Sequence, residues 1–589
     1  MVDTIPARLF AQAERRPGSP AYYEKIGGTY QPTPWSTYAD QVRRAGKSLI
    51  ALGFEPGQHV TILGFNRPEW VILDVACMAV GGAPAGIYTT NSAEEVQYIT
   101  HHAEAPLILV ENQAQLDKVL SVRDQLPHLR WIVTMRGADA SGDGILSWEE
   151  FLSRGDAVAD DDFFGRIDAL QPEGLATLIY TSGTTGPPKG VMLTHHNLTW
   201  TSDASEGVLE LTSDDRTISY LPLSHIAEQM FSIHIPITKG SAVYYAESIE
   251  QLAENIKEVR PTLFFAVPRV WEKFHAGVAA RLAESSGLKA NIGAWAQKVG
   301  RRTVHLRNMG KEPTGFAKTQ YGLANRLVFH KVKDALGLDQ CRAAVSGAAP
   351  ISPEILEFFA GFDLTILEVY GQSEGTGPTT FNRPGNTKFG TVGPAYPGTE
   401  VKLADDGEVL LKGGNVFAGY YKNEEATGET LINEWLHSGD LGEFDDDGFL
   451  TITGRKKDII ITAGGKNVAP KNLEAGLKDD LIVSEAVVIG DRRRFLTALV
   501  TLDPETSAAF AEEQGVTGPL HESEAVQSRI QATVDGVNAR YARVEQIKKF
   551  TILSRELSIE SGELTGTLKV KRAVVNEHFA ADIEAMYAD

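Results

Sequence analysis

The chain has 589 residues, of which 42% are hydrophobic and 23% charged, and this is the mixture of an ordinary globular protein. One hydrophobic core supports roughly 250–300 residues at most, so the sequence predicts several domains. The formal net charge of -21 opposes binding to nucleic-acid phosphates or to an anionic lipid surface, and we expect no nucleic-acid partner.

Three features of the sequence predict a cytoplasmic protein. Cys77 and Cys341 are the only cysteines, and two thiols so far apart give neither a disulfide framework nor a zinc pattern. The first residues carry charges where a secretory signal needs an apolar run. Residues 71–88 form the most apolar stretch, but Asp74, several glycines and a proline interrupt it. The stretch therefore predicts a buried helix and a strand, not a membrane span.

Three segments between residues 39 and 370 have the pattern of alternating strands and helices. Residues 39–110 have this βαβ rhythm, and it returns at 174–270 and 323–370. Its apolar runs are typical of central parallel strands. Residues 280–335 are rich in lysine, arginine, alanine and leucine at helical spacing, which predicts an inserted helical arm.

The pattern changes near residue 388, where short strands bounded by glycine predict an antiparallel or barrel-like subdomain. After Lys457 the chain has the pattern of a compact α+β domain. The predicted fold is therefore α/β. We expect a large N-terminal domain, 1–456, with layered βαβ subdomains and a distorted β-barrel, and a small α+β C-terminal domain, 457–589, for which the family resemblance given below implies mobility.

The most informative segment is YTSGTTGPPKG at 180–190, a loop of small and hydroxyl residues that follows an apolar strand. We expect the next residues, VMLTHHNL, to begin a helix, because a strand, a small-residue loop and a helix form a phosphate-binding arrangement. Lys189 adds a positive charge, but it lies between a proline and a glycine, which excludes a P-loop. A solvated turn is the alternative. Four hydroxyl residues add hydrogen-bond donors: Thr181, Ser182, Thr184 and Thr185.

With this loop the chain resembles the adenylate-forming superfamily of acyl-CoA synthetases, luciferases and peptide-synthetase adenylation domains, in which the loop is the signature. The long-chain fatty acyl-CoA synthetases are the most similar members, and the resemblance covers nearly the whole chain. Six further motifs follow in the family's order: YLPLSHIAEQ at 220–229, VSGAAP at 345–350, VYGQSEG at 369–375, HSGDLG at 437–442, GRKKDIIITAGGKNVAP at 454–470 and LTGTLKVKR at 564–572.

The resemblance implies an AMP-forming, ATP-dependent acid–thiol ligase that uses ATP, Mg²⁺ and coenzyme A. A long-chain fatty acid would react with ATP to give acyl-AMP and pyrophosphate, and the acyl group would then pass to coenzyme A with release of AMP. The first step brings two anions together, so electrostatic stabilisation should dominate it.

The resemblance also implies roles for single residues around the nucleotide. Tyr370 would stack on adenine, and Asp440 would accept hydrogen bonds from the ribose. Glu374 and Thr184 would hold Mg²⁺, for which a carboxylate is a suitable ligand. A turn-capping role is the alternative for Asp440, and a surface ion pair for Arg455. Further nucleotide contacts implied in the same way are Gly183, Gly347, Ala348, Ala349, Gly371, Gln372, Ser373 and Arg455.

Two basic residues are implied at the reacting groups. Lys569 matches the lysine that contacts the carboxylate and the α-phosphate, although Lys571 is close by, and a solvated face is the alternative for both. His225 would border the acyl carboxylate, or else have a structural role only.

In the second step the coenzyme A thiol must approach from the side that Lys569 occupies during adenylation. In members of this family the C-terminal domain rotates between the two steps. The resemblance places the hinge at Lys457, an exposed charged residue that can absorb a change of backbone. Gly464 and Gly465 would then let the pantetheine arm pass, with Lys466 as a weaker phosphate contact. A glycine turn without this role is the alternative.

One further pattern predicts no function. Residues 139–150 approach a calcium-binding loop, with Asp139, Asp143 and Glu150 in register. The preceding residues are strand-like and the third ligand position holds serine, so we expect a linker loop and no calcium.

Other functions remain open at this point. An acyl-AMP ligase that loads a carrier protein, or a coenzyme A ligase for another carboxylic acid, would share the ATP motifs. The acyl chain length depends on dispersed residues at 221–231, 263–271 and 343–349. Because a fatty substrate partitions into lipid, a transient peripheral contact with the inner membrane face stays open. The sequence does not determine the oligomeric state.

Overall fold

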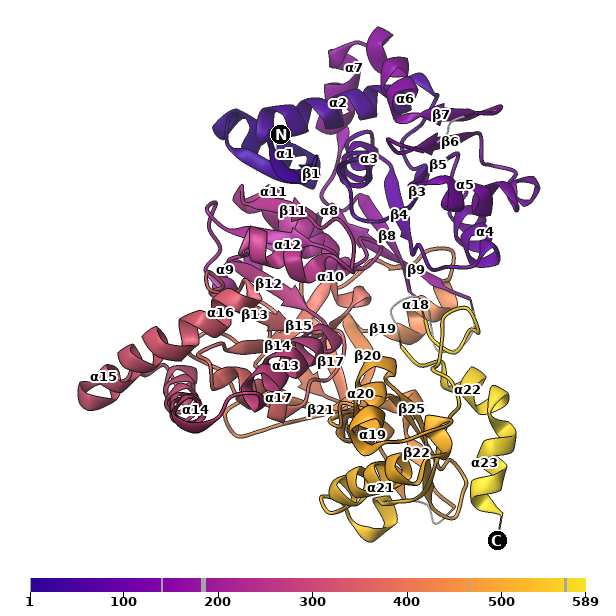
Figure 1. Ribbon diagram of the computed structural model, residues 1–589. Helices are drawn as coiled ribbons and strands as arrows, with labels where there is room; N and C mark the ends of the chain where they lie inside the picture. Colours follow the sequence, from indigo (N-terminus) through magenta and orange to yellow (C-terminus); the bar gives the residue numbers. More distant parts are fainter. Residues whose placement is uncertain (1, 139–140, 182–186, 464–465, 566–568, 589) are drawn as a thin grey trace.

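The structure is a computed structural model that describes residues 2–138, 141–181, 187–463, 466–565 and 569–588. A large body, indigo to orange in Figure 1, precedes a smaller C-terminal part that lies below it in the view. Helices and strands alternate in the body, so the α/β class expected from the sequence is confirmed.

The first layer is an eight-stranded sheet in the order β18-β9-β8-β4-β3-β5-β6-β7. It is parallel from β7 to β8, while β9 and β18 are antiparallel to their neighbours. Helices include α2 (Trp35–Ala51), α3 (Pro68–Ala79), α4 (Ala93–His102) and α5 (Gln113–Leu120). The strands are β3 (His59–Leu63), β4 (Ala83–Ile87), β5 (Leu107–Val110), β6 (Trp131–Thr134), β7 (Ile145–Ser147), β8 (Leu175–Thr181), β9 (Lys189–Thr194) and β18 (Gly419–Tyr420).

The stretch 71–88 is the buried helix and strand that the sequence predicts, because α3 and β4 are buried along their whole length. Among the helices of the described ranges, none is both long enough and apolar enough to cross a bilayer.

Two four-stranded sheets form the next layer, in the orders β10-β11-β1-β2 and β12-β13-β14-β15. Strands β12, β13 and β14 are parallel and fully or partly buried, and their carboxyl ends carry the VSGAAP and VYGQSEG motifs. The strands are β1 (Pro20–Ile26), β2 (Thr29–Pro34), β10 (Arg216–Ser219), β11 (Ala242–Tyr245), β12 (Leu263–Ala266), β13 (Ala343–Ser346), β14 (Ile366–Gln372) and β15 (Gly377–Phe381).

Beyond these sheets, the chain forms an antiparallel sheet in the order β16-β17-β20-β19, with β21 paired to β20. Because Asp440 on β20 pairs with Arg455 on β21, the sheet register brings the HSGDLG and GRKKD motifs together. The strands are β16 (Glu400–Leu403), β17 (Glu408–Lys412), β19 (Leu431–Ile432), β20 (Trp435–Phe444) and β21 (Leu450–Arg455).

Helices fill the segment between β12 and β13, and their outer part projects from the body at the left of Figure 1. The α14 helix packs against both α15 and the body helix α17 (Pro353–Ala360). The helices are α13 (Pro268–Ala283), α14 (Gly287–Asn308), α15 (Gly315–Ala324), the π-helical turn η4 (Asn325–Phe329) and α16 (His330–Leu336).

The C-terminal part contains a three-stranded sheet in the order β24-β25-β26 and has its own apolar core. It begins after β21 with the short turn η6 (Lys456–Asp458) and the pair β22 (Ile460–Ile461) and β23 (Asn467–Val468). The other elements are α19 (Pro470–Lys478), β24 (Val483–Ile489), β25 (Leu496–Leu502), α20 (Pro504–Gln514), α21 (Glu524–Asn538), β26 (Ile547–Ile552), α22 (Arg572–His578) and α23 (Ala580–Tyr587).

Candidate active site

The glycine- and hydroxyl-rich loop joins two antiparallel strands. Thr181 ends β8 and pairs with Lys189, the first residue of β9, so a strand follows the loop directly and the expected strand–loop–helix order is wrong. The helix expected in VMLTHHNL does begin there, but only at His195. The segment KGVMLT is a strand, and α8 (His195–Ala204) begins only after it, capped by Thr194. The whole of β9 therefore separates the N-terminus of α8 from Lys189. Four predicted residues lie outside the described ranges: Ser182, Gly183, Thr184 and Thr185.

Tyr420 links this loop to the predicted metal ligand. The Lys189 ammonium lies 4.8 Å from the centroid of the Tyr420 ring. The Tyr420 hydroxyl donates a hydrogen bond of 2.8 Å to Glu374 Oε1. Burial and the charge of Glu374 raise the pKa of Tyr420, so its hydroxyl stays protonated and remains a donor. Sequence analysis missed Tyr420, because nothing in GYYKN marks one tyrosine as part of a site.

Asp440 connects three strands through its carboxylate. Tyr370 on β14 donates its hydroxyl to Oδ2 at 2.8 Å, and Arg455 on β21 donates its Nε to Oδ1 at 3.1 Å. Only 8% of Asp440 is exposed. Burial and the nearby charge of Asp440 raise the pKa of Tyr370, which keeps the phenol a donor. A carboxylate accepts up to about four hydrogen bonds, so Asp440 retains capacity for further donors such as ribose hydroxyls.

The end of β14 requires glycine at one position. A bulge lies between Tyr370 and Gly371, and a Cβ on Gly371 would lie 1.7 Å from the carbonyl oxygen of Gly377. Gly371 and Gln372 end β14, and Ser373 begins the short turn η5 (Ser373–Gly375) that carries Glu374. The absent side chain at Gly371 therefore sets where the Glu374 carboxylate lies.

The VSGAAP motif follows β13 and reaches the same region. A Cβ on Gly347 would lie 2.7 Å from Val369 Cγ1 and 3.2 Å from Phe265 Cε2, so glycine allows β13 and β14 to pack closely. Ala348 has a positive φ of 68°, and both Ala348 and Ala349 are exposed. Exposed backbone beside Tyr370 is suited to contact with a planar base.

The C-terminal domain contributes Lys569 to this group. Two hydrogen bonds to Thr565 hold its backbone: Lys569 N donates to Thr565 Oγ1 at 3.0 Å, and Thr565 N donates to the Lys569 carbonyl at 2.8 Å. Lys569 is exposed to solvent on one side, but the protein packed around it and then the positive charges of Arg455 and Lys471 lower its pKa to about 8. The charges of Asp440 and Glu374 act in the opposite direction, which places Lys569 within electrostatic range of both carboxylates.

The neighbouring lysine has a different partner. Lys571 Nζ lies 3.9 Å from Glu95 Oε1 on α4, away from the carboxylates of the site. Between the two lysines that the sequence left as alternatives, the structure therefore brings Lys569 to the predicted nucleotide residues.

His225 caps a short helix and lies near Lys569. Its Nδ1 accepts a hydrogen bond of 3.2 Å from Ala227 N at the start of α10 (Ile226–Gln229). Burial, and secondarily the charge of Lys569, lower the pKa of His225 to about 4, so the ring is neutral near pH 7. A neutral ring whose Nδ1 accepts carries its proton on Nε2, which is then free to donate.

Two predicted residues of the C-terminal domain lie apart from this group. Lys466 is exposed, and its ammonium lies 3.6 Å from Glu545 Oε1. Lys457 is exposed in η6, directly after Lys456, which forms ion pairs with Asp406 and Glu408 of the body. Gly464 and Gly465 lie outside the described residues.

The dispersed segments expected to line the acyl site do meet. Phe231 stacks on Phe265 with ring centroids 4.9 Å apart, and Trp271 Nε1 donates to the Val345 carbonyl at 3.4 Å. Residues from 221–231, 263–271 and 343–349 thus form one packed apolar group beside Gly347.

In the segment that resembles a calcium-binding loop, the glutamate caps a helix. Glu150 accepts a hydrogen bond from Ser147 N at 2.8 Å in a capping box at the start of α6 (Trp148–Arg154). Asp139 lies outside the described residues.

Comparison with known proteins covers both parts of the chain. Residues 9–421 match the family described as AMP-binding enzyme, and 457–589 match its C-terminal domain family. A long-chain-fatty-acid–CoA ligase of Xenopus laevis is 40% identical, with 97% of this chain and 82% of the relative aligned. Another long-chain-fatty-acid–CoA ligase, from Mycobacterium tuberculosis, is 38% identical, with 99% and 97% aligned.

Solved structures with the same fold are more distant in sequence. The chain superposes on an anthranilate CoA ligase in complex with anthranoyl-AMP with a TM-score of 0.74, at 22% identity and with 99% of this chain and 98% of that chain covered. This likeness shows the fold of a large N-terminal and a small C-terminal domain.

We predict that Gly371→Ala displaces the turn that holds Glu374, because the new Cβ would overlap the Gly377 carbonyl. The substitution should lower the free energy of unfolding by more than about 2 kcal/mol and weaken Mg²⁺·ATP binding at least about tenfold. Thermal unfolding and calorimetric titration measure the two effects. Gly165→Ala on α7 (Asp160–Ala169), where a Cβ meets nothing within 4 Å, is the matched control and should leave both values unchanged. Equal behaviour of the two variants would contradict this role of Gly371.

Proposed function

This chain belongs to the AMP-binding enzyme family, and we propose that it works as a long-chain-fatty-acid–CoA ligase with its active site around Glu374, Asp440 and Lys569. The reaction is ATP-dependent and AMP-forming: a fatty acid and ATP give acyl-AMP and pyrophosphate, and coenzyme A then takes the acyl group. Its relatives over nearly the whole chain are long-chain-fatty-acid–CoA ligases.

One observation carries the assignment of the site. A lysine from the C-terminal domain lies within electrostatic range of two carboxylates of the body, Glu374 and Asp440, and of Arg455. Asp440, which accepts a hydrogen bond from Tyr370, is suited to a ribose, and Glu374, which accepts one from Tyr420, is suited to a metal ion. The positive charges of the lysine and the arginine are suited to phosphates and to the carboxylate of the acid.

In the first step, the protein must lower the repulsion between a carboxylate and the α-phosphate. Lys569 is positioned to neutralise charge on both groups, and a preorganised cation costs no reorganisation during the reaction. The neutral His225 ring can donate its Nε2 proton to the acid's carboxylate oxygen and orient it for attack. Asp440 and Tyr370 hold the nucleoside, and Lys189 and the loop before it bind the outgoing phosphates.

The residues present fit a magnesium ion. Glu374 Oε1 accepts from Tyr420, whereas Oε2 has no hydrogen-bond partner among the described residues and remains available. Magnesium commonly binds one or two carboxylates together with substrate phosphates, and when bound it neutralises negative charge on those phosphates. Thr184, also predicted as a ligand, lies outside the described residues.

The second step requires the C-terminal domain to leave this arrangement. The thiol must approach the adenylate carbonyl on the side that Lys569 occupies, so the domain rotates about Lys457. Ion pairs between the domains hold the arrangement seen here: Arg269 Nη2 lies 2.5 Å from Asp503 Oδ2, and Arg540 Nη1 lies 3.5 Å from Glu354 Oε1. Neither ion pair could be predicted from the sequence, because its two residues are far apart in the chain. Gly464, Gly465 and Lys466 approach the pantetheine arm only after rotation.

The proposed activity is tested by measuring AMP formation from Mg²⁺·ATP with carboxylic acids of increasing length, with coenzyme A, with an acyl carrier protein or with neither. We expect turnover that rises with chain length and requires coenzyme A. Turnover that requires the carrier protein would identify an acyl-AMP ligase instead, and a preference for short or aromatic acids would contradict the long-chain substrate.

We predict that Lys569→Ala lowers the rate of acyl-AMP formation by about 10²–10³-fold, because a preorganised charge is lost from the transition state. Thioester formation from supplied acyl-AMP should be largely unchanged, since Lys569 leaves the site for that step. Lys571→Ala is the control and should change neither half-reaction by more than a few-fold.

The pH dependence gives a second measurement of the same residue. The Lys569 pKa of about 8 means that the ammonium is present below this pH and lost above it. The adenylation kcat/KM should therefore fall as the pH rises through about 8. Lys569→Arg should keep its charge and abolish this alkaline limb if it remains active. An unchanged limb in Lys569→Arg would assign the titration to another group.

We predict that Arg269→Gln and Asp503→Asn each slow adenylation by about 3–10-fold, because a partly buried ion pair of about 1 kcal/mol favours the arrangement with Lys569 in the site. Asn can keep the N-cap that Asp503 provides to α20. The double variant should be no slower than either single one, and thioester formation should not fall. Arg281→Gln on the same helix is the control, and additive losses in the double variant would contradict coupling.

A further inference from the structure

The outer helices of the arm carry a positive charge that opposes the rest of the molecule. Between residues 287 and 333 there are ten lysines and arginines and a single acidic residue, Glu312, so this segment has a net charge of +9. The whole chain has -21, which leaves -30 on all other residues. The arm is thus a compact basic element on a strongly acidic protein.

Most of these cations are available to a partner. Arg307 and Lys333 form ion pairs with Asp363 of the body, which anchor the arm. Seven others are exposed and have no ion-pair partner among the described residues: Lys289, Lys298, Arg302, Lys311, Lys318, Arg326 and Lys331.

The same helices expose large apolar side chains. Five of the eleven exposed large hydrophobic residues of the described chain lie here: Leu288, Met309, Phe316, Leu323 and Leu327. Phe316, the most exposed at 78%, and Leu323, at 51%, lie on α15, and Leu327, at 39%, lies on η4. Their spacing of seven and then four residues places them on one side of a helix. An exposed apolar stripe of this kind needs a reason other than packing in the core of the protein.

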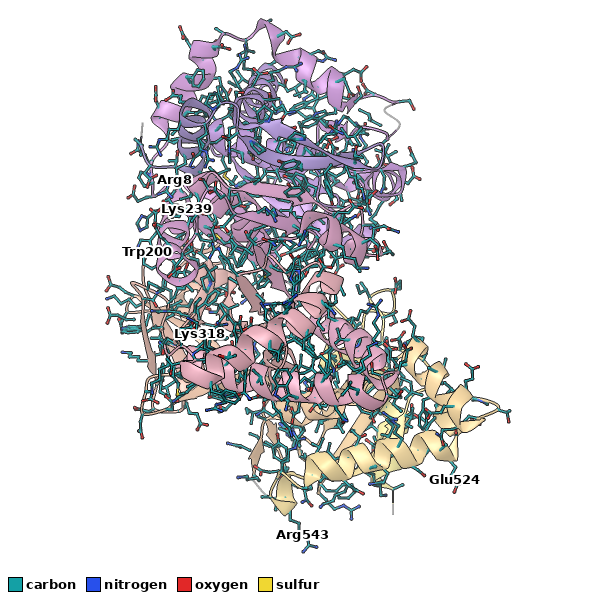
Figure 2. All side chains as sticks on the ribbon, turned by 60° about the vertical axis from the view of Figure 1, so that its left-hand side comes forward. Arg8, Trp200, Lys239, Lys318, Glu524 and Arg543 are labelled. Carbon is teal, nitrogen blue, oxygen red and sulfur yellow. The ribbon has the colours of Figure 1, made fainter. Side chains whose placement is uncertain are left out.

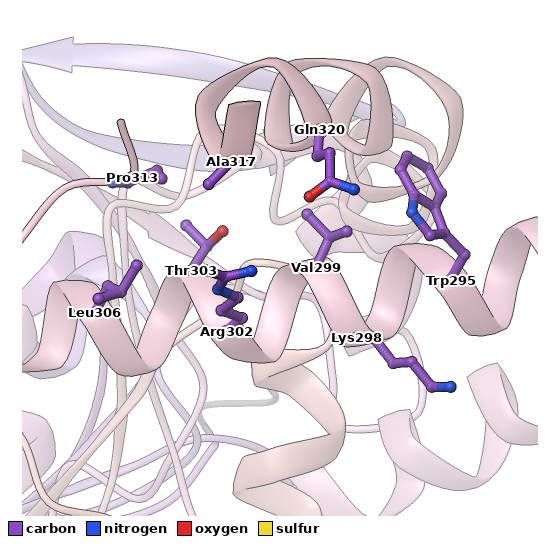
Figure 3. A pocket seen from close by; sticks show the side chains of 9 residues that line it. All are labelled: Trp295, Lys298, Val299, Arg302, Thr303, Leu306, Pro313, Ala317 and Gln320. Atoms are coloured by element: carbon purple, nitrogen blue, oxygen red, sulfur yellow. The ribbon is translucent and has the colours of Figure 1, made fainter. Parts of the chain in front are cut away.

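The arm is also placed where a large flat partner can reach it. The α15 helix lies at the end of the projection from the body in Figure 1, and Lys318 lies on this outer part in Figure 2. Between α14 and α15 there is a hollow of about 200 Å³, lined by Trp295, Val299 and Ala317 with Arg302 among them (Figure 3). It would admit a short apolar group beside a cation.

We propose that the outer part of the arm, through the stripe of Phe316, Leu323 and Leu327 and the unpaired cations on α15, η4 and α16, docks on an anionic lipid bilayer. An apolar stripe among lysines and arginines is the pattern of helices that lie in a membrane interface, where the apolar side chains enter the acyl region and the cations bind headgroup phosphates. An acidic protein could also attract the cations, but the exposed stripe at a projecting end favours a lipid surface. The reason for docking rests on the proposed function, since a bilayer holds long-chain acids.

The acidic remainder of the protein is compatible with this docking and orients it. Screening limits electrostatic interactions to about 8–10 Å at physiological salt, so a surface responds to the charge of the element nearest to it. An anionic surface attracts the arm and repels the rest of the protein, which has a net charge of -30. The net charge of -21 opposes binding of the whole protein to anionic lipid, but the separation of charge makes the arm attractive to it locally.

The test is cosedimentation of the full-length protein with vesicles of phosphatidylcholine alone or with about 30% phosphatidylglycerol, at low and high salt. We expect binding to the anionic vesicles only, weakened by salt. The variant K318E/R326E/K331E should lower the partition coefficient at least about 100-fold, since each cation near an anionic surface contributes about 1 kcal/mol. The variant F316S/L323S/L327S should lower it at least about tenfold.

The matched control reverses three exposed cations elsewhere, R492E/R543E/K548E, with the same change in charge. Arg543 lies in the C-terminal domain, far from Lys318 in Figure 2. The control should bind like the unchanged protein. All variants should form AMP normally from an acid that stays in solution, which shows that they fold. Binding that is equal for neutral and anionic vesicles, or equal losses in the arm and control variants, would overturn the proposal. The binding readout needs no turnover, so its failure is distinct from failure of the proposed function.

Discussion

The candidate site depends on the carboxylate of Asp440. It accepts hydrogen bonds from Tyr370 on β14 and from Arg455 at the end of β21, so it fixes two sheets of the body to each other. Arg455 immediately precedes Lys456 and the expected hinge at Lys457. The Asp440 carboxylate thus holds Tyr370, which is suited to stack on the base, and the last strand before the C-terminal domain. It is itself the acceptor suited to the ribose. A nearly buried charge with two donors has little freedom to move, and this rigidity is what a preorganised site requires.

A site assembled by two domains can serve two reactions because one of its halves is removable. The body holds Glu374, Asp440 and Tyr370 on strands and short turns between packed sheets, whereas Lys569 comes from a turn of the C-terminal domain. The contacts between the domains include ion pairs with exposed or partly exposed partners, which are individually weak. Weak contacts allow the domain to rotate, and the positive charges around Lys569 would be better accommodated once ATP phosphates are present. Binding of ATP should therefore favour the arrangement seen here.

Much of the fold and part of the site could be predicted from the sequence. Apolar strands, helical spacing in the arm and the order of the motifs indicated the α/β class and the residues that meet around Glu374. The strand after the glycine loop could not be predicted, because VMLT is too short to distinguish a buried strand from the start of a helix. The choice between Lys569 and Lys571 depends on hydrogen bonds between Lys569 and Thr565, which leave no pattern in the sequence. Arg269 and Asp503 are 234 residues apart, and such pairs are set by domain packing alone.

The central claim is that the carboxylate of a long-chain acid attacks ATP in this site before coenzyme A takes part. Isotope exchange between labelled pyrophosphate and ATP measures that step directly, because only a reversible adenylation returns label to ATP. We predict exchange that requires a long-chain fatty acid and Mg²⁺ and proceeds without coenzyme A. Exchange that is absent until coenzyme A is added, or that proceeds without any acid, would contradict the account.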